Sequence, residues 1–211
     1  TTASDNVAIG KSALTATLTG CRNVAIGSQT LLTNTADNNV AVGFCALKTN
    51  SSGANNTAVG RFALVFNQTG ATNTAVGQNS LHSNTTASNN TAVGAGSLFA
   101  STTGNQNTAV GKNALCANTT ANNSTAVGFS ALCTNITGAD NVAVGACALF
   151  KNIGQRNVAV GMSAAICNTT GQQNVALGYF TLDENTTGGC NIGIGGGLGR
   201  NSTGSGNIGI G

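Results

Sequence analysis

The chain has 211 residues, of which 6% are charged and 4% aromatic, with 30 glycines, no proline, no tryptophan and a formal net charge of +3. So few large side chains and so few charges exclude an ordinary globular core and also the highly charged composition of disordered chains. The 8 Lys and Arg residues are scattered, so no basic stripe indicates nucleic-acid binding, and no long apolar run indicates membrane insertion.

A glycine recurs along the whole chain at steps of 16 or 17 residues. Self-similarity at a fixed period indicates a repeat architecture. We therefore expect one continuous array over residues 1–211, without separate domains, cut from a longer protein or a processed chain. The repeated glycines are Gly10, Gly27, Gly43, Gly60, Gly77, Gly94, Gly111, Gly128, Gly145, Gly161, Gly178, Gly195 and Gly211.

A short apolar segment precedes each of these glycines. Val, Thr or Ile stands three residues before the Gly, Ile, Val or Leu stands one residue before it, and Ala or Gly lies between them. This period of two predicts a β-strand, as at residues 57–59 and 74–76. The pattern leaves two arrangements open. Either the branched pair fills the interior while Ala faces neighbouring chains, or the branched pair forms a seam between chains while Ala fits a narrow interior.

A leucine follows most of the glycines at a distance of four residues, usually after a small residue. We interpret this segment as a second short strand, so each repeat is expected to run strand, Gly turn, strand and polar turn. The polar turn is rich in Asn, Thr and Gly, as in "NTTG" at residues 168–171. Gly adopts positive φ freely, and Asn and Thr hydrogen-bond to their own backbone in turns.

An asparagine stands four residues before the Gly in every repeat except at Ser124. Stacked repeats would align these amides in a ladder along the axis. Alternatively, each Asn only supports the conformation of its turn, and either role is structural. The representative structural positions are Gly60, Gly77, Gly94, Gly111 and Gly128; Ala58, Ala75, Ala92 and Ala109; Val59, Val76, Val93 and Val110; Leu64, Leu81, Leu98 and Leu115; and Asn56, Asn73, Asn90 and Asn107.

One repeat cannot bury its own apolar columns, so repeats must stack with parallel strands about 4.8 Å apart. The expected fold is an all-β, parallel β-roll or β-solenoid of about 12 coils of 16–17 residues, with two short strands per coil. Such a rod is on the order of 60 Å long. Because one layer of Val, Ile and Leu is a thin core, we expect symmetric association along the rod to supply a second apolar contact.

The recurring "NVAIG" and "NTAVG" resemble the Asn-Ser-Val-Ala-Ile-Gly motif of YadA-type heads in trimeric autotransporter adhesins. The longer unit "NTAVGKNALCANTT", at residues 107–120, is similar to repeats of phage and giant-virus fibre proteins. The resemblance recurs in phase in every repeat and implies a left-handed parallel β-roll that trimerises with three rods side by side. The period is longer than that of the adhesin heads, with the extra residues in the polar turn. The resemblance therefore implies the roll rather than membership of the autotransporter family.

Residues suited to catalysis are few. The adjacent acids Asp183 and Glu184 precede a polar turn, which is typical of a solvated loop, and the single histidine, His82, stands at a variable position. The stretch "GIGGGLGRNS", residues 193–202, lacks the Gly-Lys-Ser/Thr ending of a phosphate-binding loop. We therefore expect no enzyme, no cofactor and no metal site.

The 7 cysteines show no Cys-x-x-Cys spacing and no His partner for zinc. Cys116 and Cys133 share the same position in successive repeats, where stacking brings Cα atoms within disulfide range, so this pair is a disulfide candidate. The alternative is that the thiols stay reduced as small apolar residues in a packed column. Sequons at Asn50, Asn67 and Asn135 are candidates for glycans if the chain is secreted in a eukaryote, and turn chemistry also explains them.

These patterns favour a structural or adhesive surface fibre over the alternatives, because repetition extends a stiff rod and multiplies weak contacts along it. We expect a homotrimer or a higher assembly that meets a receptor on a host cell or another surface, a glycan included, outside the cell on a cell, virion or phage surface. The first alternative is a lattice-binding, ice-binding-like solenoid, supported by the Thr column from Thr57 to Thr125. The second alternative is the subunit of a polymerising extracellular filament.

Overall fold

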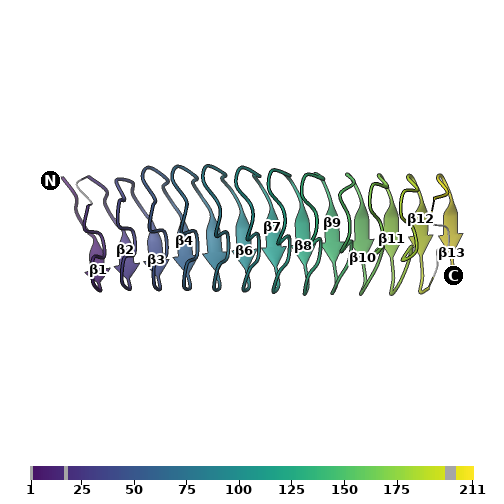
Figure 1. The fold of residues 1–211 in the computed structure, drawn as a ribbon, viewed down its shortest axis with the longest axis horizontal. Helices are drawn as coiled ribbons and strands as arrows, with labels where there is room; N and C mark the ends of the chain where they lie inside the picture. Colours follow the sequence, from purple (N-terminus) through teal and green to yellow (C-terminus); the bar gives the residue numbers. More distant parts are fainter. Residues whose placement is uncertain (1, 17–18, 198–202) are drawn as a thin grey trace.

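The computed structural model describes residues 2–16, 19–197 and 203–211. Thirteen three-residue strands lie in these parts of the chain, one before each repeated glycine, and they follow one another along a rod (Figure 1). They are β1 (Val7–Ile9), β2 (Val24–Ile26), β3 (Val40–Val42), β4 (Thr57–Val59), β5 (Thr74–Val76), β6 (Thr91–Val93), β7 (Thr108–Val110), β8 (Thr125–Val127), β9 (Val142–Val144), β10 (Val158–Val160), β11 (Val175–Leu177), β12 (Ile192–Ile194) and β13 (Ile208–Ile210).

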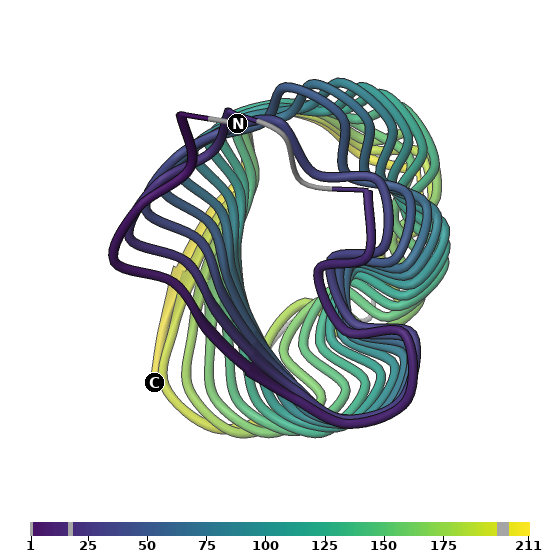
Figure 2. The same cartoon turned by 90° about the vertical axis from the view of Figure 1, so that its left-hand side faces the viewer.

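The thirteen strands form one parallel sheet in chain order. Neighbouring strands pair residue for residue, for instance Thr91 with Thr108 and Val93 with Val110. One coil of 16 or 17 residues separates each strand from the next, which confirms the β-solenoid. Figure 2 views the rod from its N-terminal end. There the chain descends on the left through the strands, crosses at the bottom and climbs on the right as it recedes, so the coil is left-handed.

Two columns of side chains fill the interior. The Ala at the centre of each strand from β2 to β11 is 0% exposed, as is each Leu of the second column from Leu31 to Leu149. The two columns are in contact: at Gly193, which takes the Ala position in β12, an added Cβ would lie 3.0 Å from Cγ of Leu182. Of the two arrangements that the sequence left open, the second therefore describes the strand, because Ala fits the narrow interior and the branched pair points outwards.

The predicted second strand is wrong. Ala63 and Leu64 are consecutive and both are 0% exposed, whereas consecutive residues of a β-strand point to opposite faces. The chain turns both inwards because residues two and four after the Gly adopt left-handed backbone angles, Phe62 at φ 60° and Leu64 at φ 51°. This segment still bonds to its neighbours: the Leu64 N–H donates to the Ser80 carbonyl at 3.0 Å, and the Phe62 N–H to the Phe44 carbonyl at 3.0 Å.

The repeated glycines adopt a backbone conformation that residues with a side chain avoid. Gly60, Gly77, Gly94, Gly111 and Gly128 have φ between 131° and 138°. A Cβ at Gly94 would lie 2.6 Å from the backbone of Gly111 in the next coil. Glycine is thus required for its backbone angle and also for the close approach of stacked coils.

Of the two roles left open for the repeated asparagine, the structure shows hydrogen bonding between coils, from a backbone N–H to a side-chain oxygen. The Oδ1 atom of each Asn accepts the backbone N–H of the Asn in the next coil, as from Asn90 to Asn73 at 3.0 Å and from Asn107 to Asn90 at 2.9 Å. Its Nδ2 group donates to a turn carbonyl, from Asn90 to Gly104 at 2.9 Å. Asn56 takes part in the same way, and Ser124 continues the column through its hydroxyl. These amides are buried, so the bonds that hold successive coils together are shielded from solvent.

Candidate functional site

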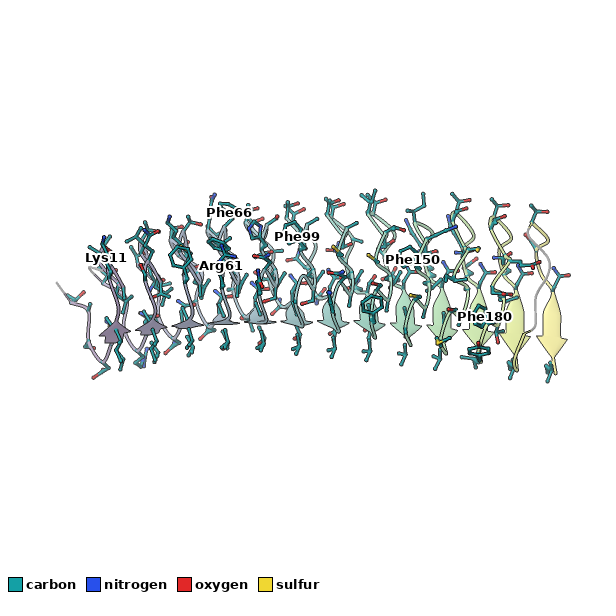
Figure 3. All side chains as sticks on the ribbon, turned by 60° about the horizontal axis from the view of Figure 1, so that its bottom comes forward. Lys11, Arg61, Phe66, Phe99, Phe150 and Phe180 are labelled. Atoms are coloured by element: carbon teal, nitrogen blue, oxygen red, sulfur yellow. The ribbon has the colours of Figure 1, made fainter. Side chains whose placement is uncertain are left out.

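The outward face of the sheet is the most regular surface of the molecule. It consists of the residues one and three before each repeated Gly, and we call these two columns the sheet strip. Its outer members Val59, Val76, Val93 and Val110 are each 36% exposed, and Ile26 is 37% exposed. Neither column contains a charged residue in any of the thirteen strands. Figure 3 shows side chains projecting from the strands at regular intervals along the rod.

The composition of the sheet strip changes along the rod. In β4 to β8 the first column is Thr and the second is Val, while in β1 to β3 and β9 to β13 both columns are aliphatic. In-register parallel pairing places equivalent side chains about 4.8 Å apart. The strip is therefore a two-column array with a hydroxyl-bearing centre and aliphatic ends.

A group of aromatic side chains, which the sequence analysis did not predict, lies on the other wall of the coil. His82 stacks on Phe99 with ring centroids 4.8 Å apart and meets the edge of Phe66 at 5.1 Å. The Phe62 ring is 6.4 Å from His82, and the Arg61 guanidinium lies 4.4 Å above the Phe62 ring. Burial lowers the pKa of His82. His82 is therefore part of an aromatic row and not an isolated surface residue, and the signal was a set of rings at neighbouring positions in successive repeats.

All seven cysteines are free thiols in the structure. Cys116 and Cys133 lie side by side in successive coils, and each thiol is partly buried. The hydrogen bond that Cys133 gives to Cys116 lowers the pKa of Cys116 to about 7. Giving that hydrogen bond, together with burial, raises the pKa of Cys133 above its ordinary value. The disulfide candidate thus takes the form of a dithiol here.

The remaining candidates do not converge. Asp183 is partly buried and Glu184 is exposed beside a polar turn, and the glycine-rich stretch at 193–202 runs into residues 198–202, outside the described residues. Across the described parts of the chain, no three His, Cys, Asp or Glu side chains form a group that could hold a metal ion. Among the same residues, no helix has the length and apolar character needed to cross a bilayer.

The sequon asparagines lie in the interior. Asn50, Asn67 and Asn135 are 0% exposed. The Asn67 amide donates to Oδ1 of Asn50 at 2.6 Å and to the Gly70 carbonyl at 2.9 Å. The folded chain does not offer these three amides for glycosylation, so the structure contradicts that part of the sequence interpretation and favours their role in the coil.

No family model matches the chain, and no curated protein matches it.

Proposed function

We propose that this chain is a rod-shaped segment of a trimeric surface fibre, which associates with other copies through the sheet strip and leaves its remaining surface free for attachment. The observation that carries the proposal is the uncharged strip itself, whose aliphatic side chains are exposed or half-buried in all thirteen strands. Soluble monomers rarely expose contiguous apolar surface of this extent, and such surface marks an interaction site.

A second copy of the chain is the partner that fits this surface best. The strip repeats at the spacing of the coils, so a parallel copy presents the same spacing and meets it along its full length. Burial of Val and Ile supplies the free energy of association, at about 25 cal/mol per Å² of apolar surface removed from water. Side-by-side packing around one axis also gives the closed symmetry that soluble oligomers favour.

Attachment would then use the wall away from the sheet. That wall carries the variable positions, among them the aromatic row and Arg61. Trimerisation presents every such position three times, so weak contacts to a receptor protein or glycan on another surface add up through multivalency. We therefore propose that the chain lies outside the cell, on a cellular, virion or phage surface.

The mass in solution tests the proposal. We expect three times 20.6 kDa, or about 62 kDa, by light scattering, and a monomer of 20.6 kDa contradicts it. Val93→Asp should shift the mass towards the monomer because it buries an unpaired charge in the seam.

Ala95→Asp is the matched control. Ala95 is exposed just after Gly94, outside the sheet strip, so this substitution should leave the mass unchanged. Circular dichroism of both variants checks that the coil stays folded, and equal masses would contradict the seam.

A lattice-binding function is the second candidate, and one observation favours it. Thr57, Thr74, Thr91, Thr108 and Thr125 all point outwards in register beside a Val column, which is a flat array of hydroxyl and methyl groups. A monomer with thermal hysteresis at micromolar concentration would support this function. A trimer without thermal hysteresis would support the fibre.

A further inference from the structure

We propose that Cys116 and Cys133 form a thiol-modification site that reacts with low-molecular-weight disulfides and closes into an inter-coil disulfide. The sheet strip does not contribute to this site, and the site does not depend on the proposed fibre. Cys116 is the attacking thiol and Cys133 is the resolving thiol.

The fold sets the geometry of the pair. The Ala117 N–H donates to the Cys133 carbonyl at 2.9 Å, so the two backbones run in register. Stacked coils then place the two Cα atoms about 4.8 Å apart, within the range of about 4.4 to 6.8 Å that disulfides span. Both thiols are partly buried and therefore remain in reach of a small reagent.

The surroundings isolate the pair. The Ala100 N–H donates to the Cys116 carbonyl at 3.0 Å, and the Thr134 N–H donates to the Phe150 carbonyl at 3.1 Å. The column therefore runs Phe99, Cys116, Cys133 and Phe150, with a ring on each side of the two thiols, and Figure 3 labels both rings. The one charge outside the pair that acts on these described thiols is that of Cys147 in the next coil, which raises the pKa of Cys133.

The roles of the two thiols follow from their hydrogen bond. Cys133 donates to the Cys116 sulfur and lowers the pKa of Cys116 from 9.0 to about 7. At pH 7 about half of Cys116 is then thiolate, against about 1% for a thiol whose pKa is 9.0. Nucleophilicity falls as pKa falls, with a Brønsted coefficient of about 0.4–0.5, so the net gain in rate is about five- to eightfold.

The reaction balances without a further reagent. The Cys116 thiolate attacks one sulfur of a disulfide RSSR, forms the mixed disulfide and expels RS⁻. Cys133 then loses its proton and attacks the Cys116 sulfur, which expels the second RS⁻. The two protein thiols are oxidised to one disulfide, and RSSR is reduced to two RSH that take up the two protons.

Oxidised glutathione is a suitable probe, with mass spectrometry of the whole folded chain and of its chymotryptic peptides, because cleavage after Phe129 separates the two cysteines. In the unsubstituted protein we expect loss of two hydrogens, a 116–133 linkage, and a Cys116 rate whose pH midpoint is near 7. Cys133→Ala should slow the reaction of Cys116 at pH 7 about five- to eightfold and leave the mixed disulfide. Cys133→Ser keeps a hydrogen-bond donor, so it should retain the fast rate and still stop at the mixed disulfide.

Cys190→Ala, which removes an exposed thiol in a distant coil, is the control and should change neither the product nor the rate of Cys116 by more than about twofold. A mixed disulfide that persists in the unsubstituted protein would overturn the resolving role of Cys133. Equal pH midpoints in the unsubstituted protein and Cys133→Ala would overturn the role of the hydrogen bond.

Discussion

The two walls of each coil bond to their neighbours in the same way and yet have different backbones. In the sheet wall, residues 91–93 are extended and alternate outward, inward, outward. In the leucine wall, residues 95–98 place two adjacent side chains, Ser97 and Leu98, inside the coil, with Leu98 in a left-handed conformation at φ 49°. Stacking identical coils is enough to align donors and acceptors, so inter-coil hydrogen bonds do not require β-strand geometry. The side-chain pattern decides which backbone each wall adopts.

The largest effect is expected at the glycine that joins the two walls. Gly94→Ala places a Cβ 2.6 Å from the backbone of Gly111 at a φ of +131°, so we expect a loss of about 3 kcal/mol or more in the free energy of unfolding. Urea denaturation measures it. Gly96→Asn is the matched control, because Asn79 and Asn113 occupy that position with positive φ. A similar loss of stability there would show that the two glycine positions tolerate a side chain equally poorly, which would contradict a special requirement at Gly94.

The inward face of the sheet wall gives the next effect. Ala92 is 0% exposed against the leucine column, so Ala92→Leu should overpack the interior and cost about 1–3 kcal/mol. Val93→Leu changes the outward neighbour on the same strand and should alter the chain's own stability by less than about 0.5 kcal/mol. Thermal melts of the two variants at one protein concentration compare them, and equal melting temperatures would mean that the interior is not packed as described.

A smaller, stabilising effect is expected where a second asparagine column is interrupted. Asn84 donates its amide to Oδ1 of Asn67 at 2.7 Å, but Ser101 takes the place of Asn in the next coil. Oδ1 of Asn84 and the Ser101 hydroxyl are both buried without a partner. Ser101→Asn should supply a donor to Oδ1 of Asn84 and raise stability by about 1 kcal/mol. Denaturant midpoints measure the change, and a lower midpoint would contradict the ladder as a source of stability.

The smallest effect is expected at the first residue of the leucine wall. Gln78 is exposed just after Gly77, and this position varies freely among the coils, with Phe44, Arg61 and Ala95 as examples. Gln78→Leu should therefore stay within about 0.5 kcal/mol of the unsubstituted protein. A calorimetric melt that moved by several degrees would show that this position packs against something.

Sequence reasoning predicted the sheet wall well because its signal is local. Branched and small residues alternate at 57–59 and at the equivalent positions of the other repeats, and this alternation fits only a β-strand. The repeat period then sets the parallel register. The prediction of a second strand in the leucine wall is wrong because two adjacent buried positions such as Ala63 and Leu64 do not fit a period of two. Leucine rarely adopts a left-handed backbone conformation, so propensity argues against it at this position. The closed coil requires this conformation because both Ala63 and Leu64 must point inwards.

Of the candidate site, the sequence contained the branched columns but not the direction in which they point. That direction depends on the width of the interior, which accepts Ala opposite Leu and excludes a second branched residue. The repeat position alone predicts that Cys116 and Cys133 are neighbours. Their different pKa values depend on a hydrogen bond that forms only in the folded coil.

The strands run across the rod (Figure 1), so the hydrogen bonds between coils lie along it. A force that stretches the rod from its ends therefore pulls directly on these bonds and loads the terminal coil first, which peels away before its neighbour. Each coil that detaches frees 16 or 17 residues, or roughly 50–60 Å of extended chain. Under tension the molecule would lengthen in equal steps, one coil at a time, and would lose its load gradually instead of failing all at once.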